Sequence, residues 1–159
     1  MRYRVGQGFD FHPLLAGRRL ILGGVEIKHE KGLSGHSDAD VAAHALANAI
    51  LGAIGEGDLG RHFPDSDPNY AGADSVRLLA EVWRLAASRG WRLVNADLTI
   101  VAQAPKLKPH LDEMRARLAQ VLVAEPALLN VKASSPESIG ALGRGDGMAA
   151  AAIVMLEAD

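Results

Sequence analysis

The chain has no cysteine among its 159 residues and few aromatic residues. The lack of cysteine excludes a disulfide framework, a thiolate nucleophile and a cysteine-bound zinc or iron–sulfur site. Any transition metal must therefore be held by histidine and carboxylate side chains. Because aromatic residues make up only 4% of the chain, we expect small side chains and close backbone packing to fill the core.

Neither sign of charge is in large excess, since 17 Lys and Arg stand against 19 Asp and Glu. This balance speaks against a surface that coats nucleic acid. The longest apolar run, residues 148–156, is far shorter than the roughly 20 residues that cross a bilayer. The chain opens with a strand-like pattern rather than a targeting segment. We therefore expect one cytoplasmic domain over residues 1–159, with neither nucleic-acid nor membrane partners.

The hydrophobic pattern predicts strands alternating with helices. Gly23 and Gly24, between two β-rich runs, predict a hairpin over 19–27. Ser37 and Asp40 have the spacing of a capping box at the start of the first helix. The alternation favours an α/β or α+β fold, a single domain with a mixed β-sheet covered by helices on one face. The expected strands are 3–7, 93–102, 130–133 and 148–156, and the expected helices are 38–54, 75–89 and 109–122.

Three residues from two distant segments are candidates for holding a metal ion. Asp10 and His12 lie two positions apart in an extended segment, so their side chains point to the same side. A solvated strand end would also explain this pair, but His44 lies off the apolar face of helix 38–54 and offers a third donor. The alternative for His44 is a solvent-facing side chain. One carboxylate and two imidazoles suit Zn²⁺ or a similar divalent ion, with a fourth position open for water or substrate.

The start of the same helix is a candidate anion site. If Ser37 caps the helix, His36 lies just ahead of the free N–H groups and positive dipole end that attract phosphate. His36 would then donate a further hydrogen bond to an oxyanion. The alternative is that Ser37 and Asp40 only cap the helix.

The loop 57–68 carries acidic side chains on a path restricted by Gly and Pro. Asp58, Asp65 and Asp67 can accept hydrogen bonds from sugar hydroxyls. The alternative is a plain acidic surface loop.

Two later segments offer groups for a nucleotide. Small residues and Pro in 102–108 leave backbone groups that can read a base edge, with Lys106 near phosphate. Serine hydroxyls in 132–137 and the guanidinium of Arg144 suit phosphate, and Glu137 suits a hard cation such as Mg²⁺. The alternatives are an ordinary strand-to-helix connection and a pair of turns.

Eight collinear motifs resemble those of the 2-C-methyl-D-erythritol 2,4-cyclodiphosphate synthase family of the non-mevalonate isoprenoid pathway. The resemblance covers nearly the whole chain. The motifs are GQGFDFH, GGVEI, KGLSGHSDADVAAHAL, GDLGRHFPDSDP, GADS, TIVAQAPKLKPH, NVKASSPE and GRGDG.

The resemblance implies a lyase that cyclises 4-diphosphocytidyl-2-C-methyl-D-erythritol 2-phosphate to 2-C-methyl-D-erythritol 2,4-cyclodiphosphate and releases CMP. It also implies a homotrimer with active sites between neighbouring subunits and a central cavity for an isoprenoid diphosphate. Two other functions stay open. One is a metal-dependent phosphohydrolase, and the other is a non-enzymatic module that binds a nucleotide or isoprenoid diphosphate.

The resemblance also implies roles for individual residues. Asp10, His12 and His44 match zinc ligands, and Glu137 matches the ligand of a second ion, Mg²⁺ or Mn²⁺. His36 and Ser135 match catalytic positions. The implied substrate-binding residues are Asp10, His12, His36, Ser37, Asp58, Gly60, Phe63, Pro64, Asp65, Ser66, Asp67, Ala102, Gln103, Ala104, Pro105, Lys106, Leu107, Lys108, Ser134, Ser135, Pro136, Glu137 and Arg144.

Some residues depart from the family pattern. Ser134, Ser135 and Pro136 stand where the family usually has Thr, and Pro136 also removes a backbone N–H. Ala141 stands where the family often has Phe. Asn48, one helical turn after His44, stands where the family often has an acidic residue, a position suited to orienting the imidazole.

Overall fold

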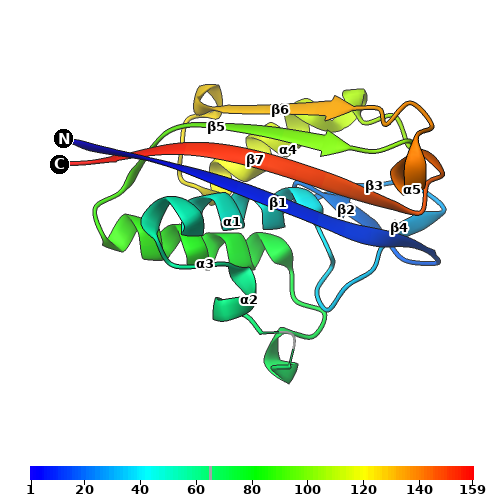
Figure 1. Cartoon of the computed structure of the whole chain (residues 1–159), viewed down its shortest axis with the longest axis horizontal. Helices are drawn as coiled ribbons and strands as arrows, with labels where there is room; N and C mark the ends of the chain where they lie inside the picture. Colours follow the sequence, from blue (N-terminus) through cyan, green and yellow to red (C-terminus); the bar gives the residue numbers. More distant parts are fainter. Residues whose placement is uncertain (65) are drawn as a thin grey trace.

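A five-stranded mixed sheet forms the centre of the fold in the computed structural model, which describes residues 1–64 and 66–159 (Figure 1). The strand order is β4-β1-β7-β5-β6. Only β5 and β6 pair in parallel, and the other neighbours are antiparallel. The strands are β1 (Arg2–Ala16), β4 (Lys31–Leu33), β5 (Arg92–Val101), β6 (Leu129–Ser134) and β7 (Gly147–Ala158), and a separate hairpin joins β2 (Leu20–Leu22) to β3 (Val25–Ile27).

Three longer helices lie on one face of the sheet (Figure 1). They are α1 (Val41–Ile54), α3 (Ser75–Ser88) and α4 (Leu111–Val121). This arrangement confirms the predicted single domain with a mixed sheet covered on one face. The short helices are α2 (Leu59–His62) and α5 (Gly140–Gly143), and single 3₁₀ turns are Pro68–Tyr70, Lys108–His110 and Pro126–Leu128. No helix of the described residues is long and apolar enough to cross a membrane.

The central helix α1 lies unusually close to β1. A Cβ atom built on Gly6 or Gly8 would come within 1.9 Å of a carbonyl oxygen of α1. The alanines of α1 that face this contact are at most 2% exposed. Glycine on the strand and alanine on the helix therefore let the two backbones approach, as the shortage of aromatic residues led us to expect.

Helix α1 begins later than predicted, and Asp40 rather than Ser37 is its N-cap. One Asp40 carboxylate oxygen accepts hydrogen bonds from the N–H groups of Ala42 and Ala43, both at 3.1 Å. The N–H groups of Gly23 and Gly24 also donate to Asp40, at 2.9 and 2.8 Å. The predicted capping box is therefore wrong, because the hairpin turn supplies two further donors that only Asp40 reaches.

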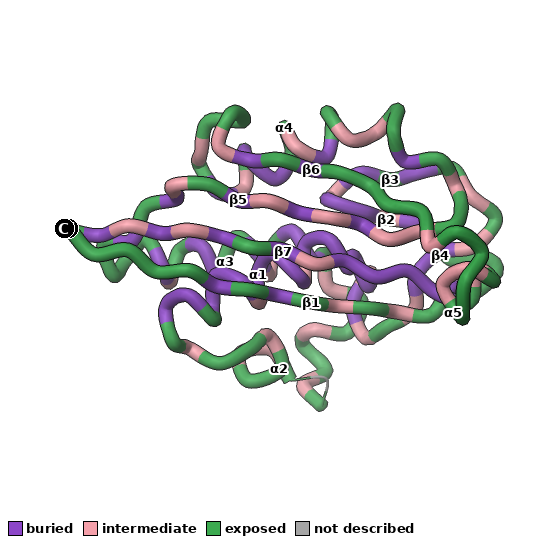
Figure 2. The backbone as a smooth tube through the Cα atoms, turned by 45° about the horizontal axis from the view of Figure 1, so that its top comes forward, coloured by how far each residue is buried: buried purple, intermediate pink, exposed green. Residues whose placement is uncertain are grey.

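The face of the sheet opposite the helices is uncovered in one chain. Its apolar side chains include Tyr3, Val5, Phe9, Phe11 and Ile153, each at least 52% exposed. Figure 2 shows β1 as largely exposed, in contrast with the buried α1 behind it. Because side chains alternate along a strand, the residues between these aromatics face α1.

Candidate metal centre and pocket

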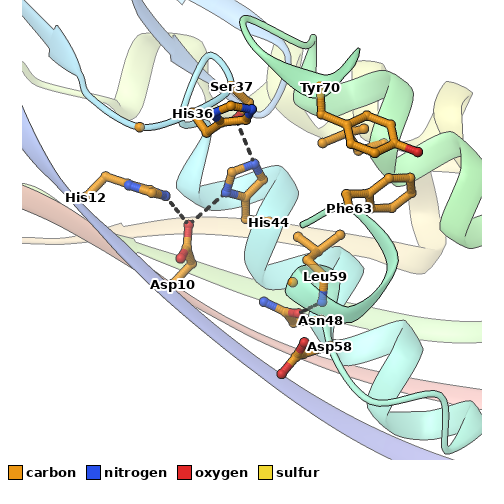
Figure 3. A pocket seen from close by; sticks show the side chains of 13 residues that line it. Asp10, His12, His36, Ser37, His44, Asn48, Asp58, Leu59, Phe63 and Tyr70 are labelled. Atoms are coloured by element: carbon orange, nitrogen blue, oxygen red, sulfur yellow. Dashed lines mark hydrogen bonds and ion pairs between the residues drawn. The ribbon is translucent and has the colours of Figure 1, made fainter. Parts of the chain in front are cut away.

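Asp10, His12 and His44 converge beside α1, as the sequence predicted (Figure 3). Strand β1 supplies the first two and α1 supplies the third. The Oδ2 atom of Asp10 lies 3.0 Å from Nδ1 of His44 and 3.2 Å from Nε2 of His12. Their candidate ligand atoms all lie within 4.8 Å of one another. Among residues 1–64 and 66–159, no other His or carboxylate group forms such a cluster of three.

The chemistry of the cluster fits a divalent metal ion. Burial opposes the charge on Asp10, but hydrogen bonds and attraction from His12 and His44 outweigh it and lower the pKa of this carboxyl. An ionised carboxylate and two imidazoles are a common ligand set for such ions. The three side chains remain 13–23% exposed, so an ion and a further ligand can reach them.

The imidazole of His44 is oriented by serine hydroxyls. Its Nε2 atom lies 2.8 Å from Oγ of Ser75 and 3.3 Å from Oγ of Ser37. Asn48 does not take this role, because its side-chain oxygen accepts a hydrogen bond from the N–H of Leu59 at 2.9 Å. Asn48 therefore fixes the start of α2, which forms part of the pocket wall. Nothing in the spacing of the sequence pointed to Ser75.

Asp40 accepts hydrogen bonds from the N–H groups of Ala42 and Ala43 at the start of α1, so those two amides are not free to bind an anion. The contact of His36 and Ser37 with an anion stays a prediction. Complete burial raises the pKa of Asp40 to about 6, although the hydrogen bonds from Gly24, Ala43 and Gly23 favour its charged form. His36 lies in the loop before the helix, with Nε2 3.3 Å from the carbonyl oxygen of Asp67.

The cluster of Asp10, His12 and His44 lies in the wall of a cavity of about 370 Å³, a volume that suits a small molecule. Of the residues expected to bind substrate, His36, Ser37, Asp58, Gly60 and Phe63 line this cavity with the cluster. Pro64, Ser66 and Asp67 follow on the same loop but are not part of the lining. Asp65 is outside the residues that the structure describes.

Two aromatic rings form one wall of the cavity, and only one of them, Phe63, was among the residues expected at the site. Tyr70 meets the ring of Phe63 edge-on, with 5.2 Å between ring centroids. Leu59 and Leu78 also line the cavity. A tyrosine in a loop of mostly polar residues was the one available hint.

The remaining expected site residues form a second group at the ends of β5 and β6. Backbone hydrogen bonding joins Ala102 N–H to the Ser134 carbonyl at 3.2 Å. The Gln103 side chain accepts from the N–H of Ser138 at 2.9 Å. Arg144 pairs with Asp146 at 2.9 Å. The segments 102–108 and 134–137 thus adjoin each other, but neither they nor Arg144 line the cavity beside the metal cluster.

A carboxylate–imidazole cluster in the wall of a small-molecule pocket is typical of metal-dependent enzymes. Residues 3–157 match the model of the YgbB family, and the chain belongs to this family. It is similar to the 2-C-methyl-D-erythritol 2,4-cyclodiphosphate synthase of Geobacillus kaustophilus, with 61% identity over 155 residues, 98% of each chain.

Two solved structures are similar over nearly the whole chain. One is the bifunctional IspDF from Campylobacter jejuni, with a TM-score of 0.95, 40% identity, and coverage of 99% of this chain and 43% of that chain. The other is a 2C-methyl-D-erythritol-2,4-cyclodiphosphate synthase in a form bound to CDP, with a TM-score of 0.89, 36% identity, and coverage of 97% of this chain and 100% of that chain.

Proposed function

We propose that the chain converts 4-diphosphocytidyl-2-C-methyl-D-erythritol 2-phosphate into 2-C-methyl-D-erythritol 2,4-cyclodiphosphate and CMP, in the cytoplasm. An oxygen of the 2-phosphate forms a bond to the β-phosphorus, and the bond from that phosphorus to the CMP oxygen breaks. No water enters the product. The observation that carries the proposal is the convergence of Asp10, His12 and His44 on the cavity, in a chain 61% identical to a protein named for this activity.

In this proposal Asp10, His12 and His44 hold Zn²⁺. Glu137 helps to hold Mg²⁺ or Mn²⁺ together with oxygens of the substrate, because its exposed carboxylate alone is a poor site. When bound, the two ions neutralise phosphate charge that would otherwise oppose the attack of one anion on another. No protein nucleophile is required, which agrees with the absence of cysteine.

The protein's own contribution is to hold a folded substrate and exclude water. His36 and Ser135 act at the phosphates as the catalytic residues, with Ser37 beside His36. Asp58 and the segment 60–67 bind the methylerythritol unit, whose hydroxyls need acceptors. The other substrate contacts in this proposal are the cytidine-binding residues 102–108 and 134–137, with Arg144. Proximity of the reacting groups in such a pocket lowers the barrier by several kcal/mol, with about 7–11 kcal/mol as the range for well-oriented groups.

We further propose a homotrimer, in which a neighbouring subunit brings its segments 102–108 and 134–144 to the cavity of the first chain. Two observations support this assembly. The two groups of expected site residues do not line one cavity in a single chain. The outer sheet face also exposes Phe9 and Phe11 by more than half, an apolar surface that a soluble chain would be expected to cover. A central cavity in the trimer would admit an isoprenoid diphosphate.

The test incubates the metal-loaded protein with its substrate in ¹⁸O-water and follows the phosphorus by ³¹P NMR and mass spectrometry. We expect a cyclic diphosphate without ¹⁸O, released together with CMP. A linear phosphate that carries ¹⁸O would instead identify a phosphohydrolase. Tight CDP binding without turnover would identify a binding module.

A further inference from the structure

His44 uses both of its ring nitrogens, and only one of them faces the metal cluster. Its Nδ1 atom is 3.0 Å from Oδ2 of Asp10, and its Nε2 atom is 2.8 Å from Oγ of Ser75. Ser75 is the first residue of α3 and is only 1% exposed. The imidazole therefore bridges the cluster and a buried hydroxyl that the proposed reaction does not use.

Asp38 determines which way the hydroxyl hydrogen of Ser75 points. Its carboxylate accepts from the hydroxyl of Ser75 and, through the other oxygen, from the N–H of Ser75 at 3.2 Å. A carboxylate has no hydrogen to donate, so the hydroxyl hydrogen of Ser75 points toward Asp38. The lone pairs of Ser75 Oγ are then left to accept, and Nε2 of His44 is the donor.

The contacts of Ser37 are consistent with this arrangement of hydrogen atoms. Its Oγ atom lies 3.2 Å from Oγ of Ser75 and accepts from the N–H of Ala39 at 3.1 Å. The hydroxyl of Ser37 can therefore donate a hydrogen bond to the second lone pair of Ser75 Oγ. Every donor and acceptor around the buried hydroxyl is then satisfied, with one proton on Nε2 of His44.

We propose that Asp38 and Ser75 are positioning residues that hold His44 in the tautomer with its proton on Nε2, so that the lone pair of Nδ1 is presented to a metal ion. This inference rests on the metal binding in the proposed function and not on the cyclisation. A neutral imidazole has one donor and one acceptor nitrogen, so fixing the donor fixes the ligand atom. Loss of such a supporting partner costs about 10- to 100-fold in metal affinity.

A capping role does not account for the Ser75 hydroxyl. The N-cap of α3 is Asp74, whose carboxylate accepts from the N–H of Val76 at 3.0 Å. Substitution of Ser75 by Ala keeps this cap and keeps the backbone N–H that donates to Asp38. The variant therefore removes only the hydroxyl between Asp38 and His44.

The first experiment measures the dissociation constant of Zn²⁺ alone, by chelator competition, for the full chain and three variants. We expect Ser75→Ala and Asp38→Asn to bind about 10- to 100-fold more weakly, with a melting profile that shows folded protein. Ser88→Ala is the matched control, because its hydroxyl only donates to the Leu85 carbonyl at the far end of α3. Wild-type affinity in folded Ser75→Ala would overturn the proposal.

The second experiment needs no variant and reads the tautomer directly. Long-range ¹H–¹⁵N NMR of the zinc-loaded wild-type protein should show the proton of His44 on Nε2 and the metal on Nδ1. The reverse assignment would overturn the proposal. Because substrate is absent from both experiments, a protein that binds zinc in this way but fails to cyclise its substrate would refute the proposed function alone.

Discussion

Gly8 of β1 faces the carbonyl oxygen of Ala45 in α1 so closely that a Cβ atom on Gly8 would be 1.9 Å from that oxygen. The same crossing places Asp10, two residues along the strand, against His44, the neighbour of Ala45. The distance between strand and helix therefore sets the distance between two of the three candidate metal ligands. A change in the packing of glycine against alanine should consequently change the metal site.

We expect Gly8→Ala to lower the free energy of unfolding by about 1–3 kcal/mol, the usual cost of overpacking, and to weaken metal binding. Thermal unfolding and chelator competition measure the two effects. Gly52→Ala is the matched control, because its added Cβ would meet only the Gln7 carbonyl oxygen, at 3.7 Å. Gly52 is an exposed helix residue, so its change to Ala should stabilise by up to about 1 kcal/mol. Equal effects of the two substitutions would contradict this account.

Asp40 should be sensitive to the loss of either of its two acceptor oxygens. The N–H groups of Gly23 and Gly24 donate to different oxygens of its carboxylate. In Asp40→Asn one of these N–H groups would face the side-chain NH₂, so we expect a loss of about 1–3 kcal/mol in unfolding free energy at pH 7. The control Asp74→Asn changes an exposed N-cap, where Asn and Asp are nearly equivalent. Denaturant titration of both variants tests the difference.

The effect of Asp40→Asn should also depend on pH. Burial raises the pKa of Asp40 from 3.8 to about 6, so the folded chain retains a proton that the unfolded chain releases between these values. The resulting stabilisation is complete below the unfolded pKa and is lost as the pH rises through 6. We therefore expect the variant to be more destabilised at pH 4 than at pH 7, measured on metal-free protein. A penalty that does not change with pH would exclude this ionisation.

The fold and the metal cluster follow from regular patterns in the sequence. The period of two along β1 put Asp10 and His12 on one side, and the helical period placed His44 off the apolar face. Both patterns depend only on neighbours within one helix or strand, so they can be recognised without knowledge of the tertiary structure.

What the sequence could not predict depends on contacts between distant segments. Ser37 and Asp40 have equal capping chemistry, and the choice of Asp40 was decided by the amides of Gly23 and Gly24. The strand Lys31–Leu33 has only three residues and exists because it pairs with β1. The role of Ser75 likewise requires a contact with a histidine 31 positions earlier in the chain.

Removal of a ligand imidazole should abolish metal binding and turnover together. We expect His12→Ala and His44→Ala to lose both, because two remaining donors hold a divalent ion poorly. His29→Ala is the control, since His29 is a histidine outside the cluster. The bound metal is measured by atomic emission, and turnover is measured by ³¹P NMR. Turnover in protein stripped of metal would contradict the proposed reaction.

The proposed trimer predicts that two inactive variants can restore each other. His44→Ala would damage the metal side of a site, and Glu137→Ala would damage the side contributed by the neighbour. In mixed trimers, some sites between subunits are intact. At these sites a Glu137→Ala chain supplies its unchanged His44, and the neighbouring His44→Ala chain supplies its unchanged Glu137. Random mixing makes this combination at about a quarter of the interfaces of a ring. We therefore expect activity to return, after unfolding and joint refolding, to about that fraction of the wild-type rate.

Phe11→Asp provides the control for the assembly itself. Phe11 is 67% exposed in one chain, so the variant should fold but fail to form trimers, because a charge would then be buried between subunits. Light scattering measures the mass, and the Phe11→Asp change added to both inactive variants should prevent their mutual rescue. Val123→Asp, at a residue 88% exposed beyond the end of α4, should leave the mass unchanged. Rescue without association would show that each chain holds a complete site, and the shared-site assembly would then be wrong.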